Sequence, residues 1–321
     1  MVFGLSGRQA GQRMAFLSSA LMMALPANAQ LAPAGVIRSA EPSADADDIV
    51  VTGKTDAKPA EVRKQARAIT PTGAIYREAL AQFQDKVCPG IIGLPADLAE
   101  VMVDRIRRNA ERIGLRAAPE GKCQPNIIAA FVLNGQKALQ DLTKRQPQAF
   151  RRIPASEVSD MLRDKGPVHA WTNTEVRSRQ GDTLQGDNSD DMTQIPVLNV
   201  AQSQSHIFLA ARLDISNSIV LIDFPAIDGM SVVQLADYVT MRTFARTLPV
   251  EGDAAASTIL ILFDKDAAPP RELTDFDVAY LRSIYGSIAS LNGASKLAHI
   301  NRELRKAQAE GATDEEDPAA E

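Results

Sequence analysis

The sequence predicts a single α+β domain, in which packed helices cover a mixed sheet. Several segments have apolar residues at every third or fourth position, as on one face of a helix. Other segments are short apolar or β-branched runs of strand length. Both ends of the chain are polar and lack such patterns, which places the folded part at residues 71–310.

The first clear helix begins at Pro95 or Ala96 and is stopped by Gly114. Its apolar residues share one face, at spacings of three and four: Leu98, Val101, Met102, Ile106, Ala110 and Ile113. A strand over residues 80–83 is expected before this helix, and the run 126–133 predicts a buried strand after it. Two shorter helices follow, at 136–144 and at 156–164, the second with Ser156 as its N-cap.

The second half of the domain begins with strands. They are expected at residues 168–177, 205–215 and 218–224, and the apolar run 219–222 predicts a central strand with both faces covered. Ser231 then caps a helix that is expected to pack across the sheet. Thr274 and Asp277 resemble a capping box that opens a helix through Tyr285, and a last amphipathic helix is expected at 295–310.

The first 29 residues predict a signal peptide. Arg8 and Arg13 precede the apolar stretch 14–25, and Ala27 and Ala29 supply the small residues of a cleavage site before Gln30. A retained membrane anchor is the alternative, but the apolar stretch is shorter than the ~20 residues that a spanning helix needs. We therefore expect a periplasmic or secreted protein with no transmembrane segment after signal removal.

Two polar segments flank the expected domain. Residues 30–70 predict a disordered linker, and residues 311–321, with the acidic run 314–317, predict a disordered tail. Removal of the signal peptide takes away two arginines, so the formal charge changes from −5 to −7. Because affinity for nucleic acid depends on basic patches that neutralise phosphates, an acidic chain of this kind is not expected to bind nucleic acid.

Cys88 and Cys123 are the two cysteines of the chain. In an oxidising compartment they predict one disulfide, which would join the segments before and after the first helix. Closing a loop of this length contributes about 3 to 4 kcal/mol by constraining the unfolded chain. A metal site is the weaker alternative, because two isolated thiols lack the paired spacing of zinc ligands.

Three segments carry a family resemblance: Cys-Pro-Gly-Ile-Ile-Gly-Leu at 88–94, Val-Gln-Leu-Ala-Asp-Tyr-Val-Thr-Met at 233–241, and Leu-Thr-Asp-Phe-Asp-Val-Ala-Tyr-Leu at 273–281. They resemble segments of a family of uncharacterised exported alphaproteobacterial proteins, over about residues 74–290. This resemblance implies a compartment, but it implies no activity and no cofactor.

The order of the expected elements also resembles the N-terminal half of zincin-type metallopeptidases. On this analogy the helix after Ser231 would be the active-site helix, which in zincins offers two histidines four residues apart to one zinc ion. Residues 232–242 contain no histidine, and the whole chain has only His169, His206 and His299. The analogy therefore implies a zincin-like scaffold without its zinc ligands, a pseudoenzyme.

The same helix supplies the candidate catalytic residues. Asp237 and Tyr238 lie in its first half and Asp228 lies in the turn before it, so two carboxylates could converge near a helix N-terminus. In the alternative interpretation Asp237 hydrogen-bonds buried backbone or the hydroxyls of Tyr280 and Tyr285, and Asp228 only shapes the turn.

Two histidines are weak candidates for a metal site. His169 and His206 are each in or near an expected strand and could face each other across the sheet. With no third ligand in view, the alternative is that they are ordinary core-edge residues. The sequence has no Gly-x-Ser-x-Gly elbow and no glycine-rich phosphate loop, so neither a serine hydrolase of that type nor a nucleotide-binding protein is indicated.

The segment Ile49, Val50, Val51 and Thr52 is β-prone and lies within the polar linker. It resembles the short box of TonB-dependent receptors, which adds as a strand to a partner in the envelope. The alternatives are a strand that docks on this protein's own sheet and a segment without structure. If the segment recruits a partner, deletion of residues 47–53 should abolish capture of that partner.

These observations lead to two hypotheses of function. The first is a non-catalytic binding or envelope-associated module, and the second is a hydrolase with a site around Asp228, Asp237 and Tyr238. A deep pocket lined by these three side chains would favour the hydrolase. A well-packed Asp237 with its hydrogen bonds satisfied would favour the binding module.

Overall fold

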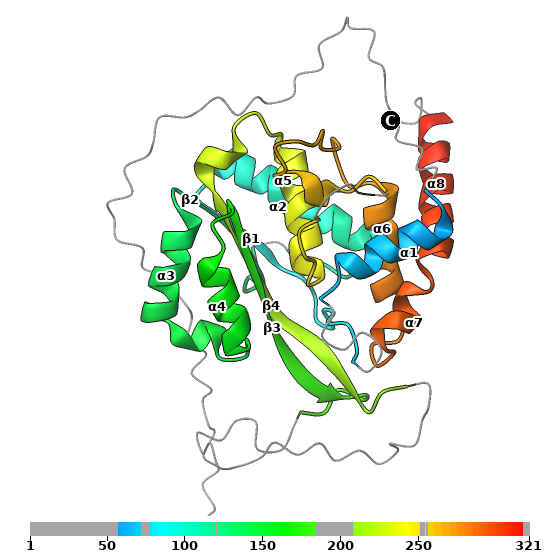
Figure 1. The fold of residues 1–321 in the computed structure, drawn as a ribbon, viewed down its shortest axis with the longest axis horizontal. Coiled ribbons are helices and arrows are strands. Elements are labelled where there is room, and N and C mark those ends of the chain that lie inside the picture. The colour runs from blue at the N-terminus through cyan, green and yellow to red at the C-terminus, as the bar shows by residue number, and fades with distance from the viewer. Residues whose placement is uncertain are drawn as a thin grey trace, which may run out of the picture. The chain divides into compact units, whose positions relative to one another are not determined.

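The computed structural model describes residues 57–71, 78–119, 121–183, 208–250, 254 and 256–316. It confirms the predicted α+β domain, with a mixed sheet of four strands among helices (Figure 1). The elements in chain order are α1 (Pro59–Ala68), β1 (Pro89–Ile92), α2 (Ala96–Arg112), β2 (Ile127–Val132), α3 (Gly135–Arg145), η1 (Pro147–Phe150), α4 (Ala155–Arg163), β3 (Val168–Ser178), β4 (Ala211–Asp223), η2 (Phe224–Ile227), α5 (Val232–Phe244), η3 (Ile259–Ile261), α6 (Asp275–Tyr285), α7 (Gly293–Leu297) and α8 (Ile300–Glu316).

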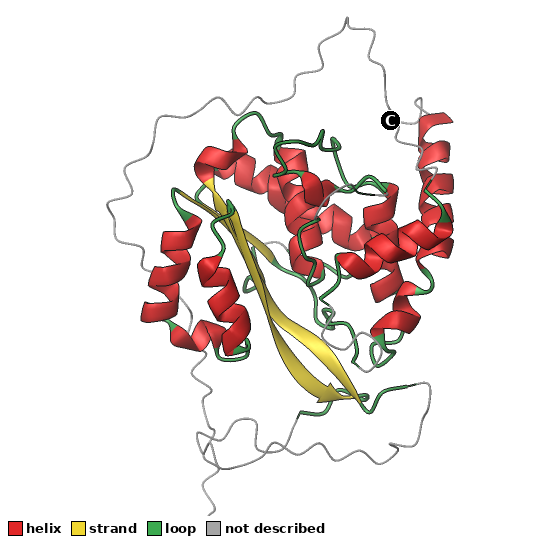
Figure 2. Ribbon diagram, in the orientation of Figure 1, coloured by secondary structure: helices red, strands yellow, loops and turns green. Residues whose placement is uncertain are grey.

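The sheet has the strand order β1-β2-β4-β3. Strands β1, β2 and β4 are parallel, whereas β3 is antiparallel to β4 and forms one edge. β3 and β4 have 11 and 13 residues, against 4 and 6 in β1 and β2. The β3–β4 pair therefore continues as a two-stranded ribbon beyond the other two strands (Figure 2).

Strand β4 replaces two of the predicted strands. Residues 205–215 and 218–224 were expected to be separate, but one strand runs through them from Ala211 to Asp223. The pairing with β3 shifts between Asn173 and Thr174, so Ser216 is the extra residue of a bulge. Ser216 Oγ donates to the carbonyl oxygen of Asn173 at 3.1 Å, which holds the irregularity without ending the strand.

Both faces of the sheet are covered, as predicted for the run 219–222. Ile219 and Leu221 pack with Trp171 and Leu139 in a small core on the side of α3 and α4. The alternate residues of the same strand, Val220 among them, belong to the larger core on the other side. In Figure 1, α2 and α5 lie on that second side, and α1, α6 and α8 lie beyond them.

Capping interactions define the helices that were predicted most accurately. The side chain of Ser231 accepts from the Gln234 amide while Gln234 bonds back to Ser231, a complete capping box at the start of α5. Thr274 and Asp277 form the predicted capping box of α6. α2 begins at Ala96, one of the two predicted positions, and α4 begins at Ala155, one residue before the expected N-cap.

The prediction of a linker up to residue 70 is wrong for its last part. α1 is a helix whose Val62 and Ala66 are fully buried in the main core. The Gln65 side chain donates to the Ala256 carbonyl at 2.8 Å and accepts from the Ala256 amide at 2.6 Å. Only one face of this ten-residue helix is buried, so its composition is polar and the segment was predicted to be a linker.

The C-terminal region also differs from the prediction. The single helix expected at 295–310 is divided into α7 and α8 around Ala298, and α8 continues to Glu316, into the segment expected to be a disordered tail from residue 311. Helix propagation adds one hydrogen bond per residue, so a helix anchored by the buried Ile300 and Ala307 extends into an acidic sequence.

The strand expected at residues 80–83 is not formed. This segment makes only isolated bridges, from Ala79 to Asn292 and from Gln82 to Asp214, and the first strand is β1.

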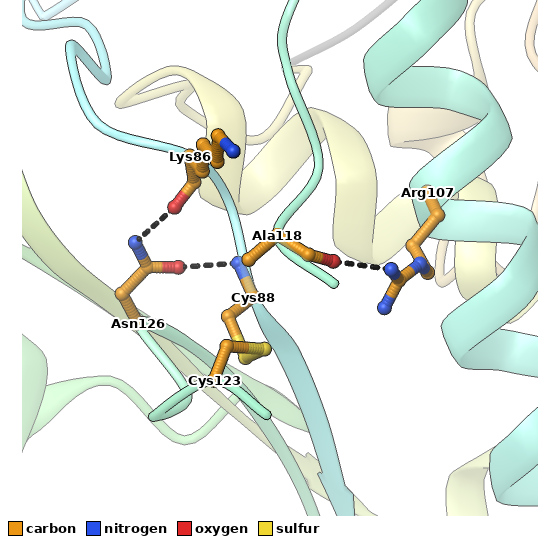
Figure 3. The surroundings of a disulfide bond; sticks show 6 residues. All are labelled: Lys86, Cys88, Arg107, Ala118, Cys123 and Asn126. Atoms are coloured by element: carbon orange, nitrogen blue, oxygen red, sulfur yellow. Dashed lines mark hydrogen bonds between the residues drawn. A yellow bond between two sulfur atoms is a disulfide. The ribbon is translucent and has the colours of Figure 1, made fainter. Parts of the chain in front are cut away.

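The predicted disulfide is confirmed: Cys88 and Cys123 are joined, and their Cα atoms are 6.1 Å apart. Figure 3 shows the bond beside β1, where Asn126 accepts from the Cys88 amide at 2.8 Å. The disulfide therefore closes the loop that contains α2.

Candidate functional site

Asp237 lies in the core between α5, α2 and the start of α6, with 0% of its surface exposed. Arg105 binds both carboxylate oxygens, with Nε 2.8 Å from Oδ1 and Nη2 2.8 Å from Oδ2. Asn109 Nδ2 donates to Oδ1 at 2.7 Å, and the Leu273 amide donates to Oδ2 at 2.7 Å. Four donors therefore occupy this carboxylate, which leaves it engaged in packing and not available as a proton acceptor.

Tyr238, the next residue of α5, is also buried. Its ring packs edge-on against Phe263, with centroids 4.9 Å apart. Burial raises the pKa of the Tyr238 hydroxyl, an effect that the charge of Arg242 opposes only in part. The phenol therefore stays protonated at neutral pH.

Asp228 does not join the other two candidates. It follows η2 on the protein surface, before Gly229, whose positive φ of 78° forms the turn into α5. Since Asp228 is exposed while Asp237 and Tyr238 are enclosed, the three side chains line no common pocket.

The alternative interpretation of Asp237 is confirmed in part, because its carboxylate accepts from the backbone amide of Leu273. The tyrosines named there bond elsewhere: Tyr280 to Thr70, and Tyr285 to the backbone of Phe83 and Phe244.

His169 is buried at the start of β3, with 2% of its surface exposed and no hydrogen-bond partner on either ring nitrogen. Burial lowers its pKa, and the carboxylates of Asp164 and Asp223 act in the opposite direction. Asp223 is itself bound to the first amide of α3, from Gly135, at 2.5 Å. His206, the other candidate, lies outside the described residues. Within the described ranges, no group of three or more His, Cys, Asp or Glu side chains is placed to hold a metal ion.

The β-prone segment Ile49, Val50, Val51 and Thr52 and the signal-peptide residues also lie outside the described residues. In the part of the chain that the structure covers, no helix combines the length and the apolar character needed to cross a membrane.

A cavity of about 280 Å³ opens to the surface between the end of α1, the end of α5 and α6. No local sequence pattern predicted it, because its walls come from parts of the chain that are far apart. The lining residues are Thr70, Pro71, Glu78, Ala79, Leu80, Ala81, Glu157, Leu213, Ala245, Arg246, Tyr280 and Ile284.

Two polar pairs are held in the walls of this cavity. The hydroxyls of Thr70 and Tyr280 are 2.8 Å apart. Arg246 Nη2 lies 2.8 Å from each carboxylate oxygen of Glu157, an ion pair that connects the end of α5 to α4. The remaining walls are mostly aliphatic. The cavity thus presents polar and apolar surface in nearly equal parts, with its polar groups held in fixed positions.

Comparison with models of protein families, with curated proteins and with solved structures finds no match to this chain. The resemblance to exported alphaproteobacterial proteins and the zincin-like order of elements therefore stay predictions from the sequence.

Proposed function

We propose that this chain is an exported, non-catalytic binding module of the cell envelope, and that it holds a small ligand in the cavity between α1, α5 and α6. The cavity carries this proposal. Its volume of about 280 Å³ is just below the range of about 300–1,000 Å³ for sites that hold drug-sized ligands. Such a space accommodates a compact ligand of a few carbon atoms with one or two polar groups.

The wall groups are suited to holding a ligand and not to moving protons. Burial raises the pKa of Tyr280, so its hydroxyl donates or accepts a hydrogen bond but does not ionise near neutral pH. Arg246 and Glu157 already neutralise each other. The buried carboxylate of α5, on Asp237, is occupied by four donors, and α5 contains no histidine. These arrangements favour binding over hydrolysis at Asp228, Asp237 and Tyr238.

Export is supported by the first 29 residues and by the disulfide. Arg8 and Arg13, the apolar stretch and the small residues at Ala27 and Ala29 have the order of a cleaved signal. The Cys88–Cys123 bond is of a kind that persists in oxidising compartments. Mass spectrometry of the protein from a periplasmic fraction tests this: we expect a chain that begins at Gln30 with no free thiol. A chain that keeps Met1, or that has two alkylated thiols in the native state, would contradict export.

The binding proposal is tested with a panel of small metabolites and thermal unfolding of the mature protein. Compounds that raise the midpoint for the wild type should fail to do so for Leu213→Trp, which places an indole in the cavity. Ala81→Leu fills the same space from another wall and serves as a second variant. Leu133→Trp is the matched control, because Leu133 is 66% exposed and does not line the cavity. If Leu213→Trp responds to the same compounds as the wild type, the cavity is not the binding site.

A hydrolase assay distinguishes the two hypotheses of function. The purified chain, with its metal content measured, is incubated with ester, peptide and glycoside substrates. We expect no turnover. Turnover that disappears in Asp228→Asn, a surface change that leaves the core intact, would favour the hydrolase.

A further inference from the structure

Arg242 differs from the other arginines that the structure describes because it is buried without a carboxylate. It lies in the last turn of α5, with 8% of its surface exposed. Its Nη1 donates to Tyr238 Oη at 3.4 Å, and its guanidinium carbon is 5.9 Å from the centre of the Tyr238 ring. Among the described residues, Arg242 forms no ion pair.

One edge of this guanidinium has no partner. Nε is enclosed and donates to no hydrogen-bond acceptor. Nη2, which together with Nε forms the planar fork of the side chain, has no partner in the described part of the chain either, but it is not enclosed. The small exposed part of Arg242 therefore includes Nη2, and the enclosed Nε lies directly beside it.

Arg105 shows what this edge binds elsewhere in the same molecule. Its Nε and Nη2 donate to the two oxygens of the Asp237 carboxylate, both at 2.8 Å. This side-on geometry matches the spacing of two oxygens in a carboxylate or a phosphate. Arg242 presents the same pair of atoms, with Nη1 already tied to Tyr238.

Burial of a guanidinium costs free energy unless acceptors replace its hydration. The ring of Tyr238 and the carbonyl end of α5 offset part of this cost. They do not satisfy Nε, which has no hydrogen-bond partner, because the hydroxyl of Tyr238 binds Nη1.

We propose that Arg242 is an oxyanion site: its accessible Nη2 binds one oxygen of a carboxylate or a phosphate group, and a small side-chain movement uncovers the adjacent Nε for a second oxygen, which completes the bidentate geometry of the Arg105–Asp237 pair. The site is independent of the cavity proposal. The contact of Nη1 with Tyr238 Oη restricts the rotation of the guanidinium.

The experiment uses the mature chain with ¹⁵N-labelled arginine and follows the Nε–Hε resonances by NMR. Sodium acetate and sodium phosphate are titrated separately at constant ionic strength, with sodium chloride as the compensating salt. We expect one Nε–Hε resonance, the one missing from Arg242→Lys, to shift saturably with at least one anion. The anion that acts identifies the class: acetate indicates a carboxylate and phosphate indicates a phosphate group.

Two variants complete the test. Arg242→Met should weaken binding by about tenfold or more, as measured by calorimetry, because the fork is lost. Arg163→Lys is the matched control, since Arg163 is an exposed arginine of α4 and its loss should leave the titration unchanged. Absence of any saturable shift of the Arg242 resonance with either anion would overturn the proposal and identify Arg242 as a packing residue. The titration is carried out on the wild type, so it tests the proposal even if Arg242→Met does not fold.

Discussion

Arg105 and Arg242 contact the same helix and have different surroundings. Arg105 reaches α5 from α2 and is neutralised by Asp237 inside the core and by Glu272 at the surface. Arg242 belongs to α5 itself and rests on the phenol of Tyr238. The first arrangement is closed, because every lone pair of Asp237 has a donor. The second leaves two donors without a protein acceptor, the enclosed Nε and the accessible Nη2. A buried charge in this fold can therefore be fully paired, as in Arg105, or keep donors that no protein group satisfies, as in Arg242.

The largest effect should follow from breaking the closed pair. Asp237→Ala leaves the Arg105 guanidinium, the Asn109 amide and the Leu273 backbone amide without their shared acceptor, so we expect a loss of about 3–5 kcal/mol in the free energy of unfolding. Urea denaturation measures this loss. Glu272 is the other partner of Arg105, and the Glu272 side chain is 61% exposed. Glu272→Ala should therefore lower the free energy of unfolding by less than about 1 kcal/mol. Equal losses in the two variants would show that the buried carboxylate of Asp237 contributes no more to stability than the exposed carboxylate of Glu272.

Lys296 in α7 is another buried cation and extends the comparison to an amine. Its Nζ donates to Gln82 Oε1 and it has no surface exposure; burial lowers its pKa to about 7. The unfolded chain holds this proton up to about pH 10.5, so the unfolded state binds more protons than the native state between pH 7 and 10.5. The free energy of unfolding should therefore rise with pH over this window, by about 1.4 kcal/mol per unit.

Lys296→Met is the variant that tests this interpretation. Its unfolding free energy, measured at several values between pH 7 and pH 10, should lack the Lys296 contribution to the slope and should exceed that of the wild type near pH 7. A wild-type slope that persists in the variant would mean that another group titrates in this range.

His169 provides a smaller effect of the same kind at acidic pH. Because burial lowers its pKa below 6.5, the native state keeps the ring neutral while the unfolded chain takes up a proton. The free energy of unfolding is therefore unaffected by His169 above about pH 6.5, and it decreases as the pH falls from there toward the native pKa of His169. His169→Leu should reduce the acid sensitivity between pH 6.5 and pH 5, as followed by thermal unfolding. An unchanged pH profile would assign the acid sensitivity to other residues.

The smallest change in stability should come from Arg242→Met. This substitution replaces a buried charge with an apolar side chain of similar length, so the free energy of unfolding should change by less than about 1 kcal/mol in either direction. Chemical denaturation without added anions measures it. A loss as large as that of Asp237→Ala would show that Arg242 is structural, and the comparison with Arg105 would fail.

Sequence patterns predicted the features that depend on neighbours along the chain. The periodic face of α2, the Ser231 capping box and the Thr274–Asp277 capping box are all local, and each was found at or near its predicted position. The disulfide was also predictable, because a chain with two cysteines allows one pairing. By contrast, the strand expected at 80–83 was wrong, because residues 79 and 82 pair with segments that are far away in the sequence.

The candidate site depended on contacts between distant residues, which one sequence does not reveal. Asp237 was predicted as a catalytic candidate from its position in a capped helix, but Arg105 comes from 132 residues earlier. The cavity joins Thr70 to Tyr280, 210 residues apart. The burial of α1 was missed for the same reason, since its partner Ala256 is 191 residues away.

The docking of α1 has a consequence for the order in which the chain becomes compact. α1 packs against α7 and α8, and Asn301 Nδ2 donates to the Pro59 carbonyl at 3.1 Å. A ribosome or translocation pore releases residue 59 long before residue 301. The first helix therefore meets Ala256 and Tyr280 before its partners in α7 and α8 emerge, and its docking is complete only when the two ends of the domain come together.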